Sequence, residues 1–302
     1  MGLIGGTGLA VLAGCGQSND AAQSTTTAPT SGGTARGSDS LVQIFPASGY
    51  VVSGLEQRMA FALGGSSGVP ERAPVDGGLS FTIFELDQSG GSTGTVTGTA
   101  LATVEVPGHA DGVPIAYYPL RYRFERPGYY GVRAVGPGMG PLDANIAVSA
   151  PDDIELVQPG DKVPVLNTPT TVDARGIDPI CTATPACPLH EIDLADAVVS
   201  GKPTALLIST PAFCQIGVCG PVLDLLVEAI GQYPQVQPIH CEVYRDAEGP
   251  TSGAIAPVVE AMGMQFEPSL YLIGADGVVR ERLDNVFDRT EINAALTRLT
   301  QG

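Results

Sequence analysis

The second half of the chain alternates buried-type apolar runs with segments of helical spacing. Residues 204–208 are apolar throughout, apart from the leading threonine, and predict a strand that is covered on both faces. Residues 221–230 carry apolar side chains at the spacing of one helix face. Further along, residues 269–273 predict a strand, residues 275–277 a hairpin turn and residues 288–299 a closing helix. Mixed strands and helices are therefore expected in this half.

The first half has a different pattern, made of short alternating segments that are rich in β-branched and aromatic residues. Clusters of Gly, Pro, Ser and Asp separate these segments, which are residues 41–45, 59–63, 79–86, 95–106, 117–124, 129–135 and 145–149. Seven short strands without helical spacing predict an all-β sandwich over residues 41–150. Residues 121–133 resemble the late hairpin of immunoglobulin-like domains, with Pro127 and Gly128 at the turn. We expect the domain boundary within residues 151–157.

The N-terminus is short, apolar and rich in glycine. Its last residues, Val11 to Cys15, resemble a bacterial lipobox, which implies that Cys15 is lipidated and that the segment before it is removed. An apolar run of this length cannot span a bilayer. Residues 16–40 contain few bulky apolar side chains and predict a flexible linker. We therefore expect a signal segment at residues 1–15 and a lipid anchor at the extracytoplasmic face of the cell membrane.

Composition limits the partners. The chain has 15 Lys and Arg against 32 Asp and Glu, for a net charge of −17. Nucleic-acid binding needs a basic surface, so this class of partner is not expected. The same acidity gives no attraction to anionic lipids, so the acyl chain has to supply membrane attachment. A hydrophobic content of 43% is sufficient for two cores of ordinary size.

The candidate chemistry is a pair of cysteines between the predicted strand and helix. A sulfur placed there lies at a helix N-terminus, where free N–H groups and the helix dipole stabilise a thiolate. Cys214 and Cys219 are five positions apart, which in a regular helix separates them by roughly 8 Å. A disulfide requires Cα atoms within about 7 Å. The pair can bond only if residues 215–218 form a loop before the helix, and Gly217 makes such a loop accessible.

The surroundings of this pair resemble the thioredoxin superfamily, closest to its extracytoplasmic, membrane-tethered members. Besides the cysteines, the matching segments are residues 160–164, 192–196, 201–204 and 255–268, where the first three look like the lead-in strands and loop of that group. The resemblance covers about residues 158–302. It implies an α/β thioredoxin-like domain, which we place at residues 151–302.

The same resemblance implies thiol–disulfide exchange on protein thiols or disulfides of secreted proteins, with no cofactor and no metal. Cys214 would attack, Cys219 would resolve, and Pro268 would be the cis-proline that borders the site. Two features depart from the family pattern besides the spacing of the cysteines. The family's tryptophan is Phe213 here, and residues 204–209 offer no buried acid as a proton acceptor.

These departures leave other interpretations open. The pair can be a structural disulfide, as is common in secreted proteins. Alternatively, the fold can persist as a non-catalytic interaction module. Copper-delivering members of the superfamily carry a cysteine pair and a distant histidine, which here would be Cys214 and Cys219 with His240 or His190. Thiolates would suit Cu(I).

The remaining cysteines form a second group. With Cys15 lipidated, five of the six cysteines are left, an odd number. Cys181 and Cys187 flank a five-residue loop and predict a small second disulfide, or an auxiliary pair that passes electrons to Cys214. Cys241 lies in an apparent core strand and is expected to be a buried free thiol.

Overall fold

A computed structural model describes residues 40–65, 68–71, 73–86 and 98–301. The predicted lipidation site at Cys15, the signal segment and nearly all of the predicted linker lie outside these residues. The described residues fall within one compact unit that spans residues 35–302. The predicted division into two domains near residue 150 therefore stays a prediction.

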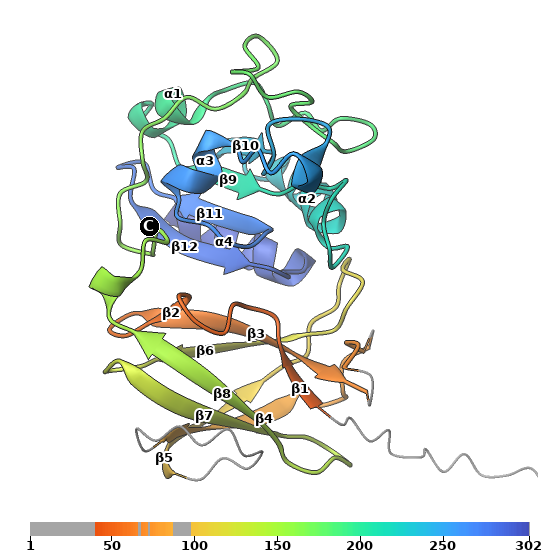
Figure 1. Ribbon diagram of the computed structural model, residues 1–302, viewed down its shortest axis with the longest axis vertical. Helices are drawn as coiled ribbons and strands as arrows, with labels where there is room; N and C mark the ends of the chain where they lie inside the picture. The colour runs from red at the N-terminus through yellow and green to blue at the C-terminus, as the bar shows by residue number, and fades with distance from the viewer. Residues whose placement is uncertain (1–39, 66–67, 72, 87–97, 302) are drawn as a thin grey trace, which may run out of the picture. The chain divides into compact units, whose positions relative to one another are not determined.

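The first half consists of two sheets (Figure 1). The three-stranded sheet has the order β1-β3-β6, all antiparallel, and its strands are β1 (Ser40–Gln43), β3 (Glu56–Gly64) and β6 (Tyr118–Arg123). The five-stranded sheet has the order β2-β8-β7-β4-β5, and its strands are β2 (Val51–Val52), β4 (Leu79–Glu85), β5 (Thr99–Val106), β7 (Gly128–Val135) and β8 (Leu142–Ser149). Only β2 and β8 pair in parallel within this sheet.

Alternation along the strands builds the core between these sheets. Along β4, Leu79, Phe81 and Ile83 are buried, while the residues between them are partly exposed. The ring of Phe81 lies 5.4 Å from the ring of Phe61 on β3, which belongs to the other sheet. The inward-facing positions of both sheets therefore share one hydrophobic cluster, as expected for sheets that pack face to face. An immunoglobulin-like topology stays a prediction.

The hairpin expected over residues 121–133 is not formed. β6 and β7 belong to different sheets, so the turn at Pro127 and Gly128 carries the chain from one sheet to the other. The hydroxyl of Tyr130 donates to the carbonyl of Arg126 at 2.9 Å, which fixes this corner. The adjacent side chain of Tyr129 remains exposed.

The second half is a mixed sheet with helices on both faces (Figure 1). The sheet order is β10-β9-β11-β12, with β9 (Thr204–Ile208), β10 (Gln237–Cys241), β11 (Ser269–Ile273) and β12 (Val279–Asp284). β10 runs parallel to β9, whereas β11 is antiparallel to both β9 and β12. The helices are α1 (Leu194–Val199), α2 (Cys219–Ile230), α3 (Pro257–Ala261) and α4 (Arg289–Gln301), with short 3-10 turns at Pro151–Asp153 and Gly249–Thr251.

The central strand β9 is apolar throughout because both of its faces are covered. Leu206 and Ile208 share a hydrophobic cluster with residues of α1 and α3. Ala205 and Leu207 pack instead in a cluster with residues of α2 and α4. A strand that is buried on both faces reads as a continuous hydrophobic run, which is the pattern that predicted it. The predicted strands at residues 204–208 and 269–273 are confirmed.

The expected lead-in strands are wrong. Residues 154–193 contain no helix and no strand, and their ladder pairing is limited to two isolated bridges, Lys162 with Val278 and Asp178 with Asp246. The segment expected as the second lead-in strand is the helix α1. Asp193 caps this helix by accepting from the N–H of Asp196 at 2.8 Å, and this capping favours a helix over a strand.

Buried polar contacts connect the β-strands of the first half to the sheet and helices of the second. Arg58 on β3 donates to Glu291 on α4 at 2.9 Å, and the hydroxyl of Tyr117 donates to the same carboxylate at 2.7 Å. The hydroxyl of Tyr50 donates to Asp284 on β12 at 2.8 Å. Arg58 and Glu291 thus form a buried, hydrogen-bonded ion pair, and Asp284 is paired in the same way with Arg282, as buried ions require.

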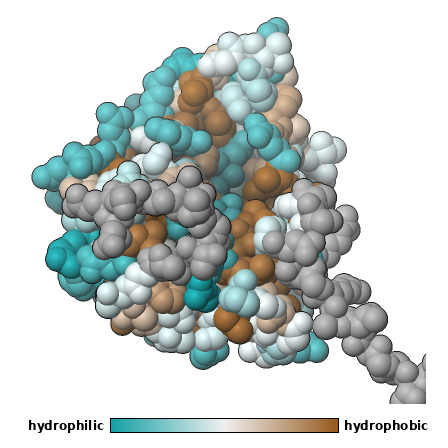
Figure 2. All heavy atoms as spheres, turned by 60° about the horizontal axis from the view of Figure 1, so that its bottom comes forward, coloured by the Kyte–Doolittle hydropathy of each residue, from teal (hydrophilic) through white to brown (hydrophobic). Residues whose placement is uncertain are grey.

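Hydrophobic side chains on the face seen in Figure 2 lie in separate patches among hydrophilic ones. None of the helices in the described part of the chain is long and apolar enough to cross a bilayer.

Candidate functional site

Cys214 and Cys219 are joined by a disulfide, with their Cα atoms 5.8 Å apart. The helix α2 begins at Cys219, so residues 215–218 form a loop that precedes it. Gly217 has a φ of +66°, in the left-handed region that glycine adopts readily. The structure therefore contains the loop at residues 215–218 that a disulfide between these two cysteines requires.

The two sulfurs differ in their surroundings. The backbone N–H of Cys219, the first residue of α2, donates to the sulfur of Cys214 at 3.2 Å. Cys214 is half-buried, whereas Cys219 is 0% exposed. When the pair is reduced, the helix N-terminus favours negative charge on the sulfur of Cys214. The arrangement therefore has one partly exposed cysteine, whose sulfur favours the thiolate, and one fully buried cysteine.

A carboxylate lies beside the shielded sulfur. The Oε2 atom of Glu267 is 3.6 Å from the sulfur of Cys219 and accepts from the N–H of Thr210 at 2.5 Å. Burial raises the pKa of Glu267 to about 7, and the negative charge of Glu242 also raises it. The hydrogen bond from the Thr210 N–H acts in the opposite direction and lowers this pKa. This carboxyl group can therefore hold or release a proton near neutral pH.

Sequence reasoning missed this acid because it examined only residues 204–209. Glu267 reaches the site from the loop before β11, next to Pro268, and the Glu267–Pro268 peptide bond is cis. Pro268 is followed by Ser269, which pairs with Ile208 at the end of β9. The signal that was available is the position of Glu267 directly before the proline that the resemblance placed at the site.

A second buried carboxylate, Glu242, follows β10. It accepts from the backbone N–H of Thr182 at 2.6 Å and from the hydroxyl of Thr182 at 3.0 Å. Burial raises the pKa of Glu242 to about 7, against these hydrogen bonds. The hydroxyl of Thr182 also accepts from the N–H of Ala212 at 3.1 Å. Thr182 therefore connects the irregular segment 154–193 to the loop that carries Cys214.

Phe213 directly precedes Cys214 in the loop before α2. Its ring packs edge-on against Tyr244, with 5.9 Å between the centroids. It also lies against Gly249, where an added Cβ would come within 2.4 Å of the ring. The residue before Cys214 is thus anchored by close packing.

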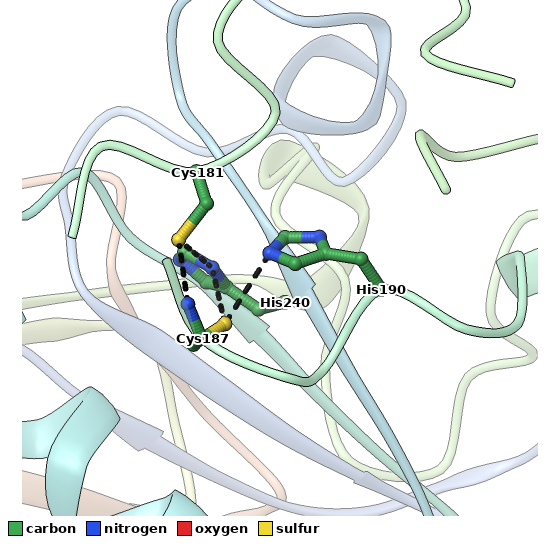
Figure 3. Close-up of side chains that lie close together, drawn as sticks. All are labelled: Cys181, Cys187, His190 and His240. Carbon is green, nitrogen blue, oxygen red and sulfur yellow. Dashed lines mark hydrogen bonds between the residues drawn. The ribbon is translucent and has the colours of Figure 1, made fainter. Parts of the chain in front are cut away.

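The second group of cysteines does not form the expected disulfide. Cys181 and Cys187 are free thiols, and their sulfurs lie against the imidazoles of His190 and His240 (Figure 3). The sulfur of Cys187 is 3.2 Å from Nε2 of His190 and 3.4 Å from Nδ1 of His240. The sulfur of Cys181 is 3.8 Å from the same Nδ1 of His240 and accepts from the N–H of Cys187 at 3.3 Å. The two sulfurs therefore contact imidazole nitrogens and a backbone N–H instead of bonding to each other.

The ligand set considered for copper is also corrected. Among the described residues, His240 and His190 gather with Cys181 and Cys187 rather than with the Cys214–Cys219 pair. In this cluster the hydrogen bond with Cys187 lowers the pKa of the Cys181 thiol.

Cys241 is a buried free thiol, as predicted. Burial raises its pKa to about 12, which removes it from thiolate chemistry near neutral pH.

Comparison with known proteins returns structures but no sequence relatives. No protein-family model and no curated protein matches the chain. A solved structure assigned as thiol:disulfide interchange protein DsbE from Chlorobium tepidum is 15% identical, covers 48% of this chain and 96% of its own, and has a TM-score of 0.33. A thioredoxin family thiol:disulfide interchange protein from Chlorobium tepidum TLS is 11% identical, with coverages of 47% and 97% and a TM-score of 0.31.

A third solved structure that is similar to part of this chain is the filamin domain of Lin-41. It is 12% identical, covers 36% of this chain and 91% of its own, and has a TM-score of 0.23. The assignment of the second half rests on its own strand order and helices, which are those of a thioredoxin-like α/β fold.

Proposed function

We propose that the protein is a thiol–disulfide oxidoreductase in which Cys214 attacks and Cys219 resolves. The observation that carries the proposal is the position of the disulfide at the N-terminus of α2, with a carboxylate of near-neutral pKa beside the inner sulfur. A structural disulfide needs neither a proton acceptor nor an accessible sulfur. An exchanging pair uses both.

In the reducing direction, the thiolate of Cys214 attacks a substrate disulfide. One substrate sulfur leaves as a thiolate and takes a proton, and the other becomes bonded to Cys214. The carboxylate of Glu267 then accepts the proton of the Cys219 thiol, and the resulting thiolate attacks the sulfur of Cys214. This step closes the Cys214–Cys219 disulfide and releases the second substrate thiol. Two electrons pass from the pair to the substrate, and the reverse sequence oxidises a substrate dithiol.

A groove of about 470 Å³ next to the pair supports a polypeptide substrate. Gln215 and Ile216 of the cysteine loop line it, together with Tyr244 and Glu267. The side chain of Ile216 is 43% exposed, so it offers apolar surface to a docked segment. Pro268, directly after Glu267, borders the same site and is assigned to the positioning of that segment.

We place this activity at the extracytoplasmic face of the cell membrane, on disulfides or thiols of secreted proteins. The support is the lipobox-like sequence that ends at Cys15 and the Cys214–Cys219 disulfide, a type of bond that persists mainly in oxidising compartments. Palmitate labelling of the full chain in bacterial cells tests the anchor. Label should be lost in Cys15→Ser, and unchanged labelling would refute the anchor without touching the exchange chemistry.

Trapping of the mixed disulfide tests the exchange chemistry. In Cys219→Ser the resolving thiol is absent, so a peptide that contains a disulfide should remain covalently attached through Cys214. The matched variant Cys214→Ser should form no adduct, because Cys219 is shielded. Mass spectrometry of the adduct identifies the bonded cysteine. Equal trapping by both variants, or by neither, would contradict the assigned roles.

A further inference from the structure

A second cluster of side chains, separate from the disulfide, has the composition of a metal site. Its members are Cys181, Cys187 and His190 from the irregular segment before α1, and His240 from β10. One ligand atom of each lies within 4.8 Å of the ligand atoms of the other three. Figure 3 shows the four side chains converging on one point. We propose that these four residues bind one zinc ion.

The distances suit a tetrahedral ion. With Zn–S near 2.3 Å and Zn–N near 2.0–2.1 Å, a sulfur and a nitrogen of one tetrahedral site lie about 3.6 Å apart. Three of the four sulfur–nitrogen pairs lie 3.2, 3.4 and 3.8 Å apart, on both sides of that value, and all four ligand atoms lie within 4.8 Å of one another. A set of two sulfurs and two nitrogens in this geometry is typical of zinc. Small shifts of the four side chains would therefore complete the coordination.

The hydrogen bonds of His240 orient it as a ligand. Its Nε2 lies 3.1 Å from the carbonyl oxygen of Ser209 and 3.1 Å from the hydroxyl of the same residue. A carbonyl oxygen can only accept, so Nε2 carries the proton. Nδ1 is then unprotonated, and it faces both sulfurs. Such an outer hydrogen bond, which fixes the tautomer of a metal-binding histidine, is the usual arrangement in zinc sites.

Burial and charge favour a divalent ion. Cys181 is 8% exposed, His190 2% and His240 0%, so the site is largely closed to solvent. Two thiolates and one Zn²⁺ sum to zero charge, which removes the cost of burying an unpaired ion. A monovalent copper ion with the same thiolates would leave one negative charge buried. Cys187 is partly exposed and leaves a path from solvent.

The position of the cluster indicates a structural role. Three ligands lie within ten residues of a segment that has no helix or strand, and the fourth lies in the sheet. Long stretches without secondary structure are uncommon in compact domains. An ion that joins this segment to β10 would supply order that its own backbone lacks, because metal binding adds directly to folding free energy. Four protein ligands leave no open position, as in structural zinc sites.

The same ion would support the neighbouring disulfide site. Ser209, which orients His240, is followed by Thr210, whose N–H donates to Glu267. Thr182, next to Cys181, accepts from Ala212 in the loop before Cys214. The zinc site thus fixes the backbone from which the disulfide loop begins. This inference stands independently of the exchange activity.

Metal binding to the full chain tests the proposal. The protein is purified in reducing buffer, stripped with a chelator, and titrated with Zn²⁺ and separately with Co²⁺. We expect one equivalent of tightly bound zinc, and for cobalt the near-ultraviolet absorption of thiolate-to-metal charge transfer with the intense visible bands of a tetrahedral site. Binding below half an equivalent, or cobalt spectra without thiolate bands, would overturn the proposal.

Variants identify the ligands. Cys181→Ser and His240→Gln should each weaken zinc binding by more than about 100-fold, beyond the 10–100-fold typical of outer-shell changes. Cys241→Ala, a change in a neighbouring buried thiol that is not a ligand, and the double variant Cys214→Ser, Cys219→Ser should both retain the full equivalent. Loss of zinc in the double variant would assign the metal to the other pair. A Cys181–Cys187 disulfide in the freshly purified, reduced protein would also overturn the proposal.

Discussion

The second half of the chain holds two cysteine pairs in neighbouring loops, five and six positions apart in sequence. Cys214 and Cys219 are closed into a disulfide at the start of a twelve-residue helix, with a carboxylate beside the inner sulfur. Cys181 and Cys187 are open, and each sulfur faces an imidazole nitrogen. The two cysteine pairs thus have nearly the same spacing in sequence, but different groups lie beside their sulfurs.

The comparison shows that partners distant in sequence decide what a cysteine pair does. Glu267 comes from the loop before β11, and His240 comes from β10. A carboxylate can take a proton from a thiol and so promotes exchange, whereas two imidazole nitrogens beside two sulfurs make up a ligand set for a metal. Four experiments test whether the two cysteine pairs differ in this way.

Glu267→Gln removes the proton acceptor from the exchanging pair. We expect the step in which Cys219 displaces the substrate from Cys214 to slow by about 100-fold, the lower end of general-base effects. Wild-type rates should rise with pH through about 7, because the carboxyl must lose its proton before it can accept one. The titratable groups near this carboxyl are the Cys219 thiol, Glu242 and Tyr244.

Stopped-flow measurement of mixed-disulfide resolution between pH 5.5 and 8.5 checks this. The rise near pH 7 should be absent in the glutamine variant, and zinc binding should be unchanged. A variant that keeps the wild-type rate and pH profile would show that Glu267 has no role in proton transfer.

Removal of zinc should destabilise the other region. At free zinc one hundred times the dissociation constant, the ion contributes about 2.7 kcal/mol to stability. This corresponds to a decrease in Tm of roughly 5–10 °C for a chain of this size. Calorimetry with and without chelator gives the shift, and limited proteolysis should then cut first within residues 178–190. A Cys181→Ser protein should show no response to chelator, and an equal response there would count against the assignment.

The pKa of Glu267 also predicts how stability depends on pH. Its value in the folded protein, about 7, lies above the ordinary value of 4.5, so between these pH values the folded state holds a proton that the unfolded state has lost. Its contribution to stability therefore falls as pH rises from about 4.5 to about 7. Urea unfolding of Glu267→Gln should be less dependent on pH over this window than that of the wild type. Parallel curves would contradict the raised pKa.

The smallest expected effect concerns the loop before Cys214. In Gly249→Ala the new methyl group would come within 2.4 Å of the Phe213 ring, at a φ of +56° that alanine adopts at a cost. We expect a loss of roughly 1–2 kcal/mol and a changed reduction potential, since Phe213 precedes Cys214. Gly253→Ala, with a positive φ but open space, is the matched control. If both variants had the same reduction potential, the packing of the Phe213 ring would have no effect on the disulfide.

Local patterns predicted the elements that carry their own signal. The apolar runs at residues 204–208 and 269–273 are strands because both faces of the sheet are covered, and the loop before α2 follows from the reach of a disulfide. The predicted hairpin between β6 and β7 was wrong, because these consecutive strands belong to different sheets. Glu267 and the cluster around His240 were missed because no local pattern reports which distant loops meet.

The most direct test of the account is a redox titration of the reduced full chain in graded glutathione buffers, with each cysteine followed by alkylation and mass spectrometry. We expect Cys214 and Cys219 to interconvert between about −120 and −270 mV, the range of known exchangers. Cys181 and Cys187, loaded with zinc, should form no disulfide over the same range. A Cys214–Cys219 bond that stays closed below about −300 mV would make it a structural disulfide and contradict the central claim.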